Sequence, residues 1–159
     1  MRRVAVAVAL CYVACFTAQA TEACAHRGDN KAAPENTLPA FASAVQKHAP
    51  QIEFDIHLTK DGEMVVIHDN TVDRTTNGKG RVAEMSFEAI RALDAGTWFD
   101  PKFAGTKIPT PREALDVIPH EILCNVHLKD APGVAKAAAA LIKEMGRLDH
   151  CFLACSIEQ

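Results

Sequence analysis

Histidines and carboxylates lie at or near the ends of short apolar runs in this chain of 159 residues. His26 ends the first run, and His68 follows the run Met64–Ile67. Glu53 and Asp55 lie between them in an alternating segment, two residues apart, so they share one face of a strand. Two carboxylates on one face suit a hard divalent cation, and histidine, which titrates near neutral pH, suits proton transfer. These residue types predict metal-assisted acid–base chemistry.

Strands and helices alternate along the chain in a pattern that would position these groups. Strand patterns cover residues 22–26, 51–58, 64–67, 121–128 and 151–155. Helical spacing and capping signals cover residues 37–48, 86–93, 110–118 and 132–145. Strands separated by helices predict parallel β/α units, in which the active site lies at the carboxyl ends of the strands. His127 and Lys129 end the fourth strand pattern and so join the candidate site.

Each feature also has a structural explanation when it is taken alone. A histidine at a strand end is often a hydrogen-bonded structural residue. Glu53 and Asp55 could form the solvated face of an edge strand. The functional interpretation therefore depends on these features occurring together.

Short motifs follow one another in a fixed order from residue 26 to residue 110. They are His26-Arg27-Gly28, Pro34-Glu35-Asn36-Thr37, Phe41, Glu53-x-Asp55, Thr59-Lys60-Asp61-Gly62, His68-Asp69, Arg74-Thr75-Thr76, Gly78-x-Gly80, Asp94-Ala95-Gly96 and Ile108-Pro109-Thr110. In this order they resemble the glycerophosphodiester phosphodiesterase family, and the resemblance runs from about Cys24 to Ser156. It implies an α/β fold, a (β/α)8 TIM barrel of the phosphatidylinositol-phosphodiesterase-like type, with an insertion at about residues 69–109.

The resemblance also implies an activity. The family cleaves a glycerophosphodiester to glycerol 3-phosphate and an alcohol, so the expected partner is a small-molecule glycerophosphodiester. By resemblance, His26 and His68 would be the catalytic acid–base pair. Glu53 and Asp55 would hold one divalent metal ion, calcium or magnesium.

The fourth strand pattern departs from the family at one position. By resemblance Arg27 and Lys129 would contact the substrate phosphate, and Glu35 would support the first loop. The family usually has a third metal-binding glutamate two residues before the lysine, where this chain has His127. His127 could be a metal ligand, which would favour manganese, iron or zinc, or it could hydrogen-bond the phosphate or a neighbouring carboxylate.

The chain is short for a complete barrel. A (β/α)8 domain takes about 250 residues, and only five of the eight strand patterns are present. We therefore expect the barrel to be C-terminally incomplete, as in a fragment or truncated gene model. A self-contained half-barrel is the alternative.

The N-terminal residues have the pattern of an export signal. Two arginines precede the apolar run Val4–Phe16, and Ala18-Gln19-Ala20 resembles a signal-peptidase site. The run is shorter than the roughly 20 apolar residues that span a bilayer, which makes a retained anchor the weaker alternative. We expect residues 1–20 to be removed and residues 21–159 to form a periplasmic or extracellular domain without a stable membrane span.

Charge and cysteine content add two expectations. The net charge of −3 argues against a nucleic-acid partner bound through a basic surface. Export would permit disulfides, but Cys124, Cys151 and Cys155 lie in apolar strand patterns, where buried thiols are common. Free thiols are the first expectation, disulfides that include Cys24 stay open, and the oligomeric state is undetermined.

The sequence thus favours a metal-dependent phosphodiesterase that uses histidines for acid–base catalysis. One alternative is a phospholipase D-like phosphodiesterase that acts on a lipid. The other is a non-catalytic barrel that binds phosphodiesters or glycans, which His127 and the short chain make plausible.

Overall fold

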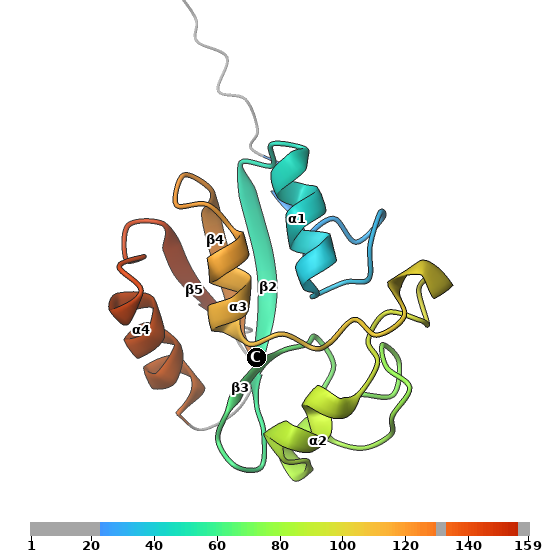
Figure 1. Ribbon diagram of the computed structural model, residues 1–159. Coiled ribbons are helices and arrows are strands. Elements are labelled where there is room, and N and C mark those ends of the chain that lie inside the picture. Colours follow the sequence, from blue (N-terminus) through green and yellow to red (C-terminus); the bar gives the residue numbers. More distant parts are fainter. Residues whose placement is uncertain (1–22, 130–132, 156–159) are drawn as a thin grey trace, which may run out of the picture.

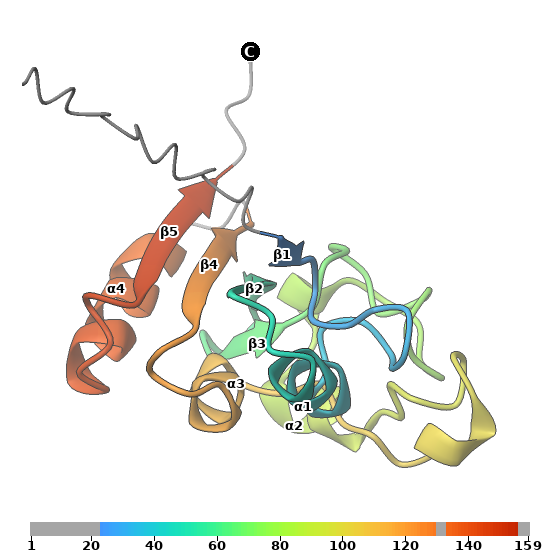
Figure 2. The same cartoon turned by 90° about the horizontal axis from the view of Figure 1, so that it is seen from above.

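A curved sheet with helices on one face forms the centre of the computed structural model, which describes residues 23–129 and 133–155 (Figure 1, Figure 2). Its parallel strands lie in the order β1–β2–β4–β5. Their bounds are Cys24–Ala25 for β1, Gln51–Leu58 for β2, Leu123–Leu128 for β4 and Cys151–Cys155 for β5. The order and direction of these strands are those of an incomplete α/β barrel, as the sequence predicts.

The third strand, β3 (Met64–Val66), runs in the opposite direction to the others. It pairs antiparallel with the end of β2, with Leu58 opposite Met64. The prediction that all five strands are parallel is therefore wrong for β3, which is antiparallel. The physical reason is the connection, because residues 59–63 form a tight turn with Gly62 at φ 83°, whereas a parallel crossover needs about a dozen residues or more.

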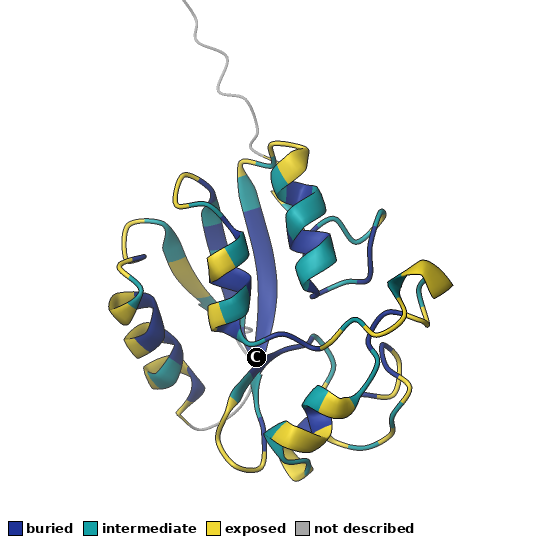
Figure 3. Ribbon diagram, in the orientation of Figure 1, coloured by how far each residue is buried: buried dark blue, intermediate teal, exposed yellow. Residues whose placement is uncertain are grey.

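Three helices cover the outer face of the sheet: α1 (Leu38–Gln46), α3 (Pro111–Val117) and α4 (Val134–Glu144). The alternation predicted for β2 is confirmed, since Ile52, Phe54 and Ile56 join the core beneath these helices. Burial of such apolar side chains is the main favourable contribution to folding. Their neighbours on β2 point to the opposite, concave face, and the strand is buried along most of its length (Figure 3).

Local signals set where the helices begin. Thr110 and Glu113 form the predicted capping box at the start of α3, with Pro111 in its first turn. Ser86 accepts a hydrogen bond from the Ala89 N–H at the start of α2 (Phe87–Ala92). Thr37 precedes α1 without a side-chain cap, because its Oγ1 donates to the Pro34 carbonyl oxygen instead. The predicted beginning of α4 at Pro132 lies outside the described residues.

The segment between β3 and α3 packs around a second apolar core. It contains α2 and two short 3-10 helices, η1 (Val82–Glu84) and η2 (Pro101–Phe103). The buried apolar residues of this core are Val65, Ile67, Val72, Val82, Ile90, Ala95 and Ile108. The segment is thus an ordered lobe that begins directly after β3, so it can hold the residues that follow β3 in fixed positions.

Apolar side chains remain uncovered on β5. Phe152 on the concave face is 41% exposed, and Leu153 on the helix face is 38% exposed. Among the described residues β5 pairs only with β4, so its other edge is open. An open edge beside exposed apolar side chains favours association between chains.

We therefore predict that the isolated 159-residue chain is insoluble, or soluble only as an oligomer, and inactive. Multi-angle light scattering after size-exclusion chromatography measures its state directly. A monodisperse monomer with a cooperative unfolding transition would contradict the prediction and support a self-contained half-barrel.

The structure bears only in part on the predicted export signal and on the expectation of no stable membrane span. The expected signal, residues 1–20, lies outside the described residues. Across the residues that the structure describes, no helix has both the length and the apolar character needed to cross a bilayer.

The thiols of Cys24, Cys124, Cys151 and Cys155 are free. Cys155 is exposed rather than buried, because no neighbouring element in the described part covers this end of β5.

Candidate metal and phosphodiester site

The concave face of the sheet brings three possible metal ligands together. Glu53 and Asp55 project from β2, and the parallel register places His127 of β4 directly opposite Asp55. One ligand atom of each residue lies within 4.8 Å of the others. The sequence prediction that these three side chains meet therefore agrees with the geometry. Two carboxylate oxygens and one imidazole nitrogen form a donor set that fits a divalent cation.

The electrostatics of the two carboxylates differ. Burial and the neighbouring Asp55 carboxylate raise the pKa of Glu53 to about 7. Burial also opposes the ionisation of Asp55, but hydrogen bonds from Lys129 and Asn36 lower its pKa overall. Two buried carboxylates this close repel each other when both are charged. A cation between them would relieve that repulsion. The closeness of these two buried carboxylates is therefore the observation that makes the pair fit a metal ion.

Lys129 and His127 both contact Asp55. The Lys129 ammonium lies 2.8 Å from Asp55 Oδ1 and 3.2 Å from His127 Nδ1. His127 Nδ1 lies 3.2 Å from the same Asp55 oxygen and 3.8 Å from Glu53 Oε1. His127 Nδ1 is thus directed at the carboxylates, which is compatible with both alternatives that the sequence left open. The Lys129 ammonium, predicted to contact phosphate, forms an ion pair with Asp55.

The two candidate catalytic histidines reach this face from different loops. His26, directly after β1, is largely exposed, and its Nε2 lies 3.9 Å from Glu53 Oε2. His68 follows β3, and its Nδ1 lies 2.7 Å from Asp69 Oδ1. The antiparallel direction of β3 returns the chain toward Asp55, since Ile67 N–H donates to the Asp55 carbonyl oxygen. The hairpin therefore brings His68 to the site without a third parallel strand.

Arg27 joins the first loop to the carboxylates. Its backbone N–H donates to Glu53 Oε2 at 2.8 Å, and its guanidinium Nε lies 3.7 Å from Asp55 Oδ2. Glu35, predicted to support the first loop, accepts a hydrogen bond from Arg27 Nη1 at 2.8 Å. Arg27 has a φ of 58°, a conformation that costs energy in a residue other than glycine. The surrounding contacts hold this strained residue against the Glu53 and Asp55 carboxylates.

Sequence reasoning missed four contributors to the site. Asn36 is buried, and its Nδ2 donates to Asp55 Oδ2 at 2.8 Å. His57 follows Asp55 on β2, and its Nε2 lies 3.1 Å from the backbone oxygen of His68. Asp69 and Arg74 form ion pairs beside His68. Asn36, Asp69 and Arg74 stand in the sequence motifs given above. The motifs identify these residues but do not predict which side chains they contact.

Comparison with known protein families gives one match over most of the chain. Residues 26–147 match the model of the glycerophosphoryl diester phosphodiesterase family. A curated glycerophosphodiester phosphodiesterase from Caldanaerobacter subterraneus subsp. tengcongensis is 49% identical over 125 residues, which cover 76% of this chain and 51% of the relative. The chain spans about half the length of the curated relatives it matches.

Solved structures agree with the sequence comparison. A glycerophosphodiester phosphodiesterase from Agrobacterium tumefaciens superimposes with a TM-score of 0.79 at 38% identity, covering 84% of this chain and 57% of that one. An Oleispira antarctica phosphodiesterase, solved in complex with the product sn-glycerol-3-phosphate, superimposes with a TM-score of 0.78 at 32% identity. That match covers 83% of this chain and 56% of the other. The structural similarity therefore extends over most of this chain, as does the family match over residues 26–147.

Proposed function

This chain belongs to the glycerophosphoryl diester phosphodiesterase family, and from that membership we propose that the whole protein hydrolyses a glycerophosphodiester to glycerol 3-phosphate and an alcohol. The observation that carries the proposal is the convergence of Glu53, Asp55 and His127, with ligand atoms within 4.8 Å. The sn-glycerol-3-phosphate product held by the Oleispira antarctica relative supports the same substrate class.

Glu53, Asp55 and His127 would hold one divalent metal ion. When bound, the metal supplies Lewis-acid chemistry by withdrawing charge from the phosphate oxygens. The basic groups at the site would add to that effect, because Arg27 and Lys129 both lie beside the carboxylates. Fixed positive charge near a phosphodiester stabilises the charge that develops during its hydrolysis. The site therefore combines ligands for a cation with groups that attract an anion.

His26 and His68 would move the protons of the reaction. Hydrolysis adds water to phosphorus and breaks the bond to the alcohol, so one group must accept a proton from water and another must give one to the leaving oxygen. Asp69 is held ionised, since hydrogen bonds from Arg74 and His68 lower its pKa. Asp69 therefore accepts the proton of His68 Nδ1, which leaves His68 Nε2 to exchange protons with the substrate or water.

The direct test measures release of glycerol 3-phosphate from glycerophosphocholine by the whole protein, including any residues that its gene encodes beyond Gln159. Calcium, magnesium, manganese and zinc are each supplied in turn. Release with at least one of them is expected. No release with any metal would contradict the proposal and favour a non-catalytic binding barrel, for which the histidine at position 127 is the specific argument. Release of a head group from intact lipid alone would favour a phospholipase.

The same proposal includes the location and organisation of the protein. We propose that residues 1–20 direct export and are removed, which leaves a domain that begins at residue 21 and has its insertion at about residues 69–109. The charge pattern and apolar run at the N-terminus support this. N-terminal sequencing of the protein from its host tests it, and an intact Met1 would contradict it.

His127 is expected to act as a metal ligand that moves the preference from calcium toward a transition ion. Nitrogen donors favour manganese, iron or zinc relative to calcium. His127→Glu restores an anionic oxygen, so it should increase calcium affinity by about 10-fold or more and reduce the transition-metal preference. Isothermal titration of the whole protein with each metal measures both changes.

His120→Glu is the matched control for that variant. His120 is exposed and precedes the N-terminal end of β4, whereas His127 lies near the C-terminal end. The same change in charge therefore occurs away from the proposed ligands. Its metal preference should equal that of the wild type. Unchanged metal preference in His127→Glu would instead indicate that His127 only hydrogen-bonds the phosphate or a carboxylate.

A further inference from the structure

Arg74, in the lobe that follows β3, binds two carboxylates at the same time. Its Nε and Nη2 donate to the two oxygens of Asp69 at 2.7 and 3.0 Å. Its Nη1 and Nη2 donate to the two oxygens of Glu35 at 2.8 Å each. Every nitrogen of the guanidinium is therefore engaged, in a double bidentate arrangement that only a planar, five-donor group can form.

Each of these carboxylates also contacts a group of the proposed site. Asp69 Oδ1 lies 2.7 Å from His68 Nδ1. Glu35 Oε1 accepts from Arg27 Nη1 at 2.8 Å. A continuous series of contacts thus leads from His68 through Arg74 to Arg27. The two ends of the series come from loops far apart in the sequence, and Arg74 is the residue that connects them.

We propose that Arg74 is a positioning residue, which fixes His68 and Arg27 relative to each other by holding Asp69 and Glu35. The roles of His68 and Arg27 in this statement rest on the proposed function. Without Arg74, two carboxylates would face each other with no cation between them, and each could turn away from its partner. The His68 ring would then lose its fixed orientation, and the Arg27 guanidinium would lose its fixed position.

A purely structural ion pair is the competing explanation. The Arg74 side chain is 45% exposed, and the less exposed Glu35 keeps Arg27 as a second partner when Arg74 is removed. Ion pairs of exposed side chains contribute little to stability. Its removal should therefore leave the folded protein largely intact while it disturbs the site. Arg112 provides a matched control, because its side chain is 47% exposed and pairs with Glu144 at 2.7 Å across two helices of the outer face.

Steady-state kinetics of the whole protein on glycerophosphocholine test the proposal. Arg74→Ala should lower kcat/KM by about 100-fold, the effect expected from small displacements of reacting groups. Arg74→Lys should recover little of this, because an ammonium cannot hold two carboxylates in bidentate fashion. Glu35→Gln should mainly raise KM and Asp69→Asn should mainly lower kcat, whereas Arg74→Ala changes both. Arg112→Ala should leave both constants unchanged.

The outcomes separate the roles of Arg74. A full recovery in Arg74→Lys, or constants in Arg74→Ala equal to those of Arg112→Ala, would overturn the proposal. Adding Glu35→Gln to Arg74→Ala should raise KM no further, because the two residues act in series. A further increase equal to that of Glu35→Gln alone would show independent action and would also overturn it.

A measurement that needs no activity keeps this inference separate from the proposed function. Long-range ¹H–¹⁵N spectra report which ring nitrogen of His68 carries the proton. The wild type should show a single form protonated at Nδ1, and Arg74→Ala should show a mixture. An unchanged His68 signal in Arg74→Ala would overturn the proposal. A wild-type protein that hydrolyses no glycerophosphodiester would contradict the proposed function, and the His68 comparison would still decide the role of Arg74.

Discussion

Replacing Asp55 with asparagine is expected to lower kcat/KM of the whole protein on glycerophosphodiesters by about 100- to 1,000-fold. Asp55 is fully buried, and Lys129, Asn36 and His127 all contact its carboxylate. The substitution preserves the size of the side chain but removes one anionic ligand of the proposed metal site. It also leaves the Lys129 ammonium without its carboxylate partner, so both cation binding and the charge balance of the site are lost.

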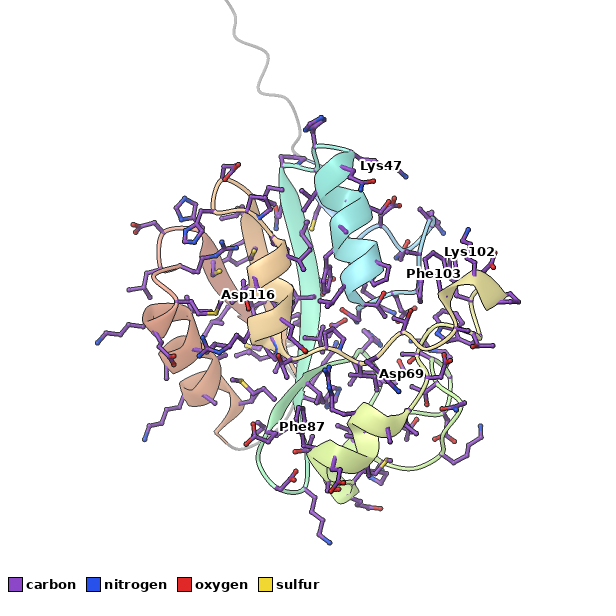
Figure 4. The ribbon with its side chains drawn as sticks, viewed as in Figure 1. Lys47, Asp69, Phe87, Lys102, Phe103 and Asp116 are labelled. Atoms are coloured by element: carbon purple, nitrogen blue, oxygen red, sulfur yellow. The ribbon has the colours of Figure 1, made fainter. Side chains whose placement is uncertain are left out.

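The measurement combines kinetics with isothermal titration of the metal that activates best. Asp55→Asn should show weaker metal binding together with the loss of rate, and the circular dichroism spectrum should stay that of the wild type. Asp116→Asn is the matched control, since Asp116 is exposed on α3, a helix of the outer face (Figure 4). Retained activity in Asp55→Asn at full metal affinity would contradict the assignment of this site.

Single replacement of His26 or His68 by alanine is expected to reduce kcat by about 100- to 10,000-fold, the usual contribution of a general acid or base. Metal affinity should change little, because neither residue belongs to the ligand set of Glu53, Asp55 and His127. The combination of lost turnover and retained metal binding distinguishes these variants from Asp55→Asn.

Substrates with different leaving groups identify which histidine is the acid. A p-nitrophenyl ester of glycerol phosphate releases a stable anion and needs no proton from the protein. One of the two alanine variants should therefore recover part of its rate on this substrate, and the other should not. Recovery in both variants, or in neither, would contradict an acid–base pair. His120→Ala serves as the control, because His120 is exposed at the opposite end of β4.

The sequence by itself determined the elements and the residues that can do chemistry. Alternation along Gln51–Leu58 predicted which face of β2 packs under the helices, because side chains of a strand alternate whatever surrounds it. The capping box at Thr110 predicted the start of α3, because such signals act within a few residues. The same reasoning placed Glu53, Asp55 and His127 on one face, and register pairing of β2 with β4 brought them together.

The direction of β3 was within reach of the sequence but was missed. The five residues between Leu58 and Met64, which include Asp61-Gly62, are too few for a parallel crossover. The number of strand patterns suggested a regular barrel of parallel strands. The short connection from β2 to β3 instead makes β3 antiparallel. The consequence for the site is favourable, since the hairpin returns the residue before His68 to the backbone of Asp55.

Only the tertiary structure decided which charged groups pair. Arg27, Arg74 and Lys129 could each have bound any of several nearby carboxylates, and the sequence does not rank those choices. Packing of the lobe after β3 against the first loop places Glu35 within 2.8 Å of both Arg27 and Arg74, and the register of β4 places Lys129 against Asp55. Ion pairing depends on distance and burial, and both are set by contacts between segments far apart in the chain.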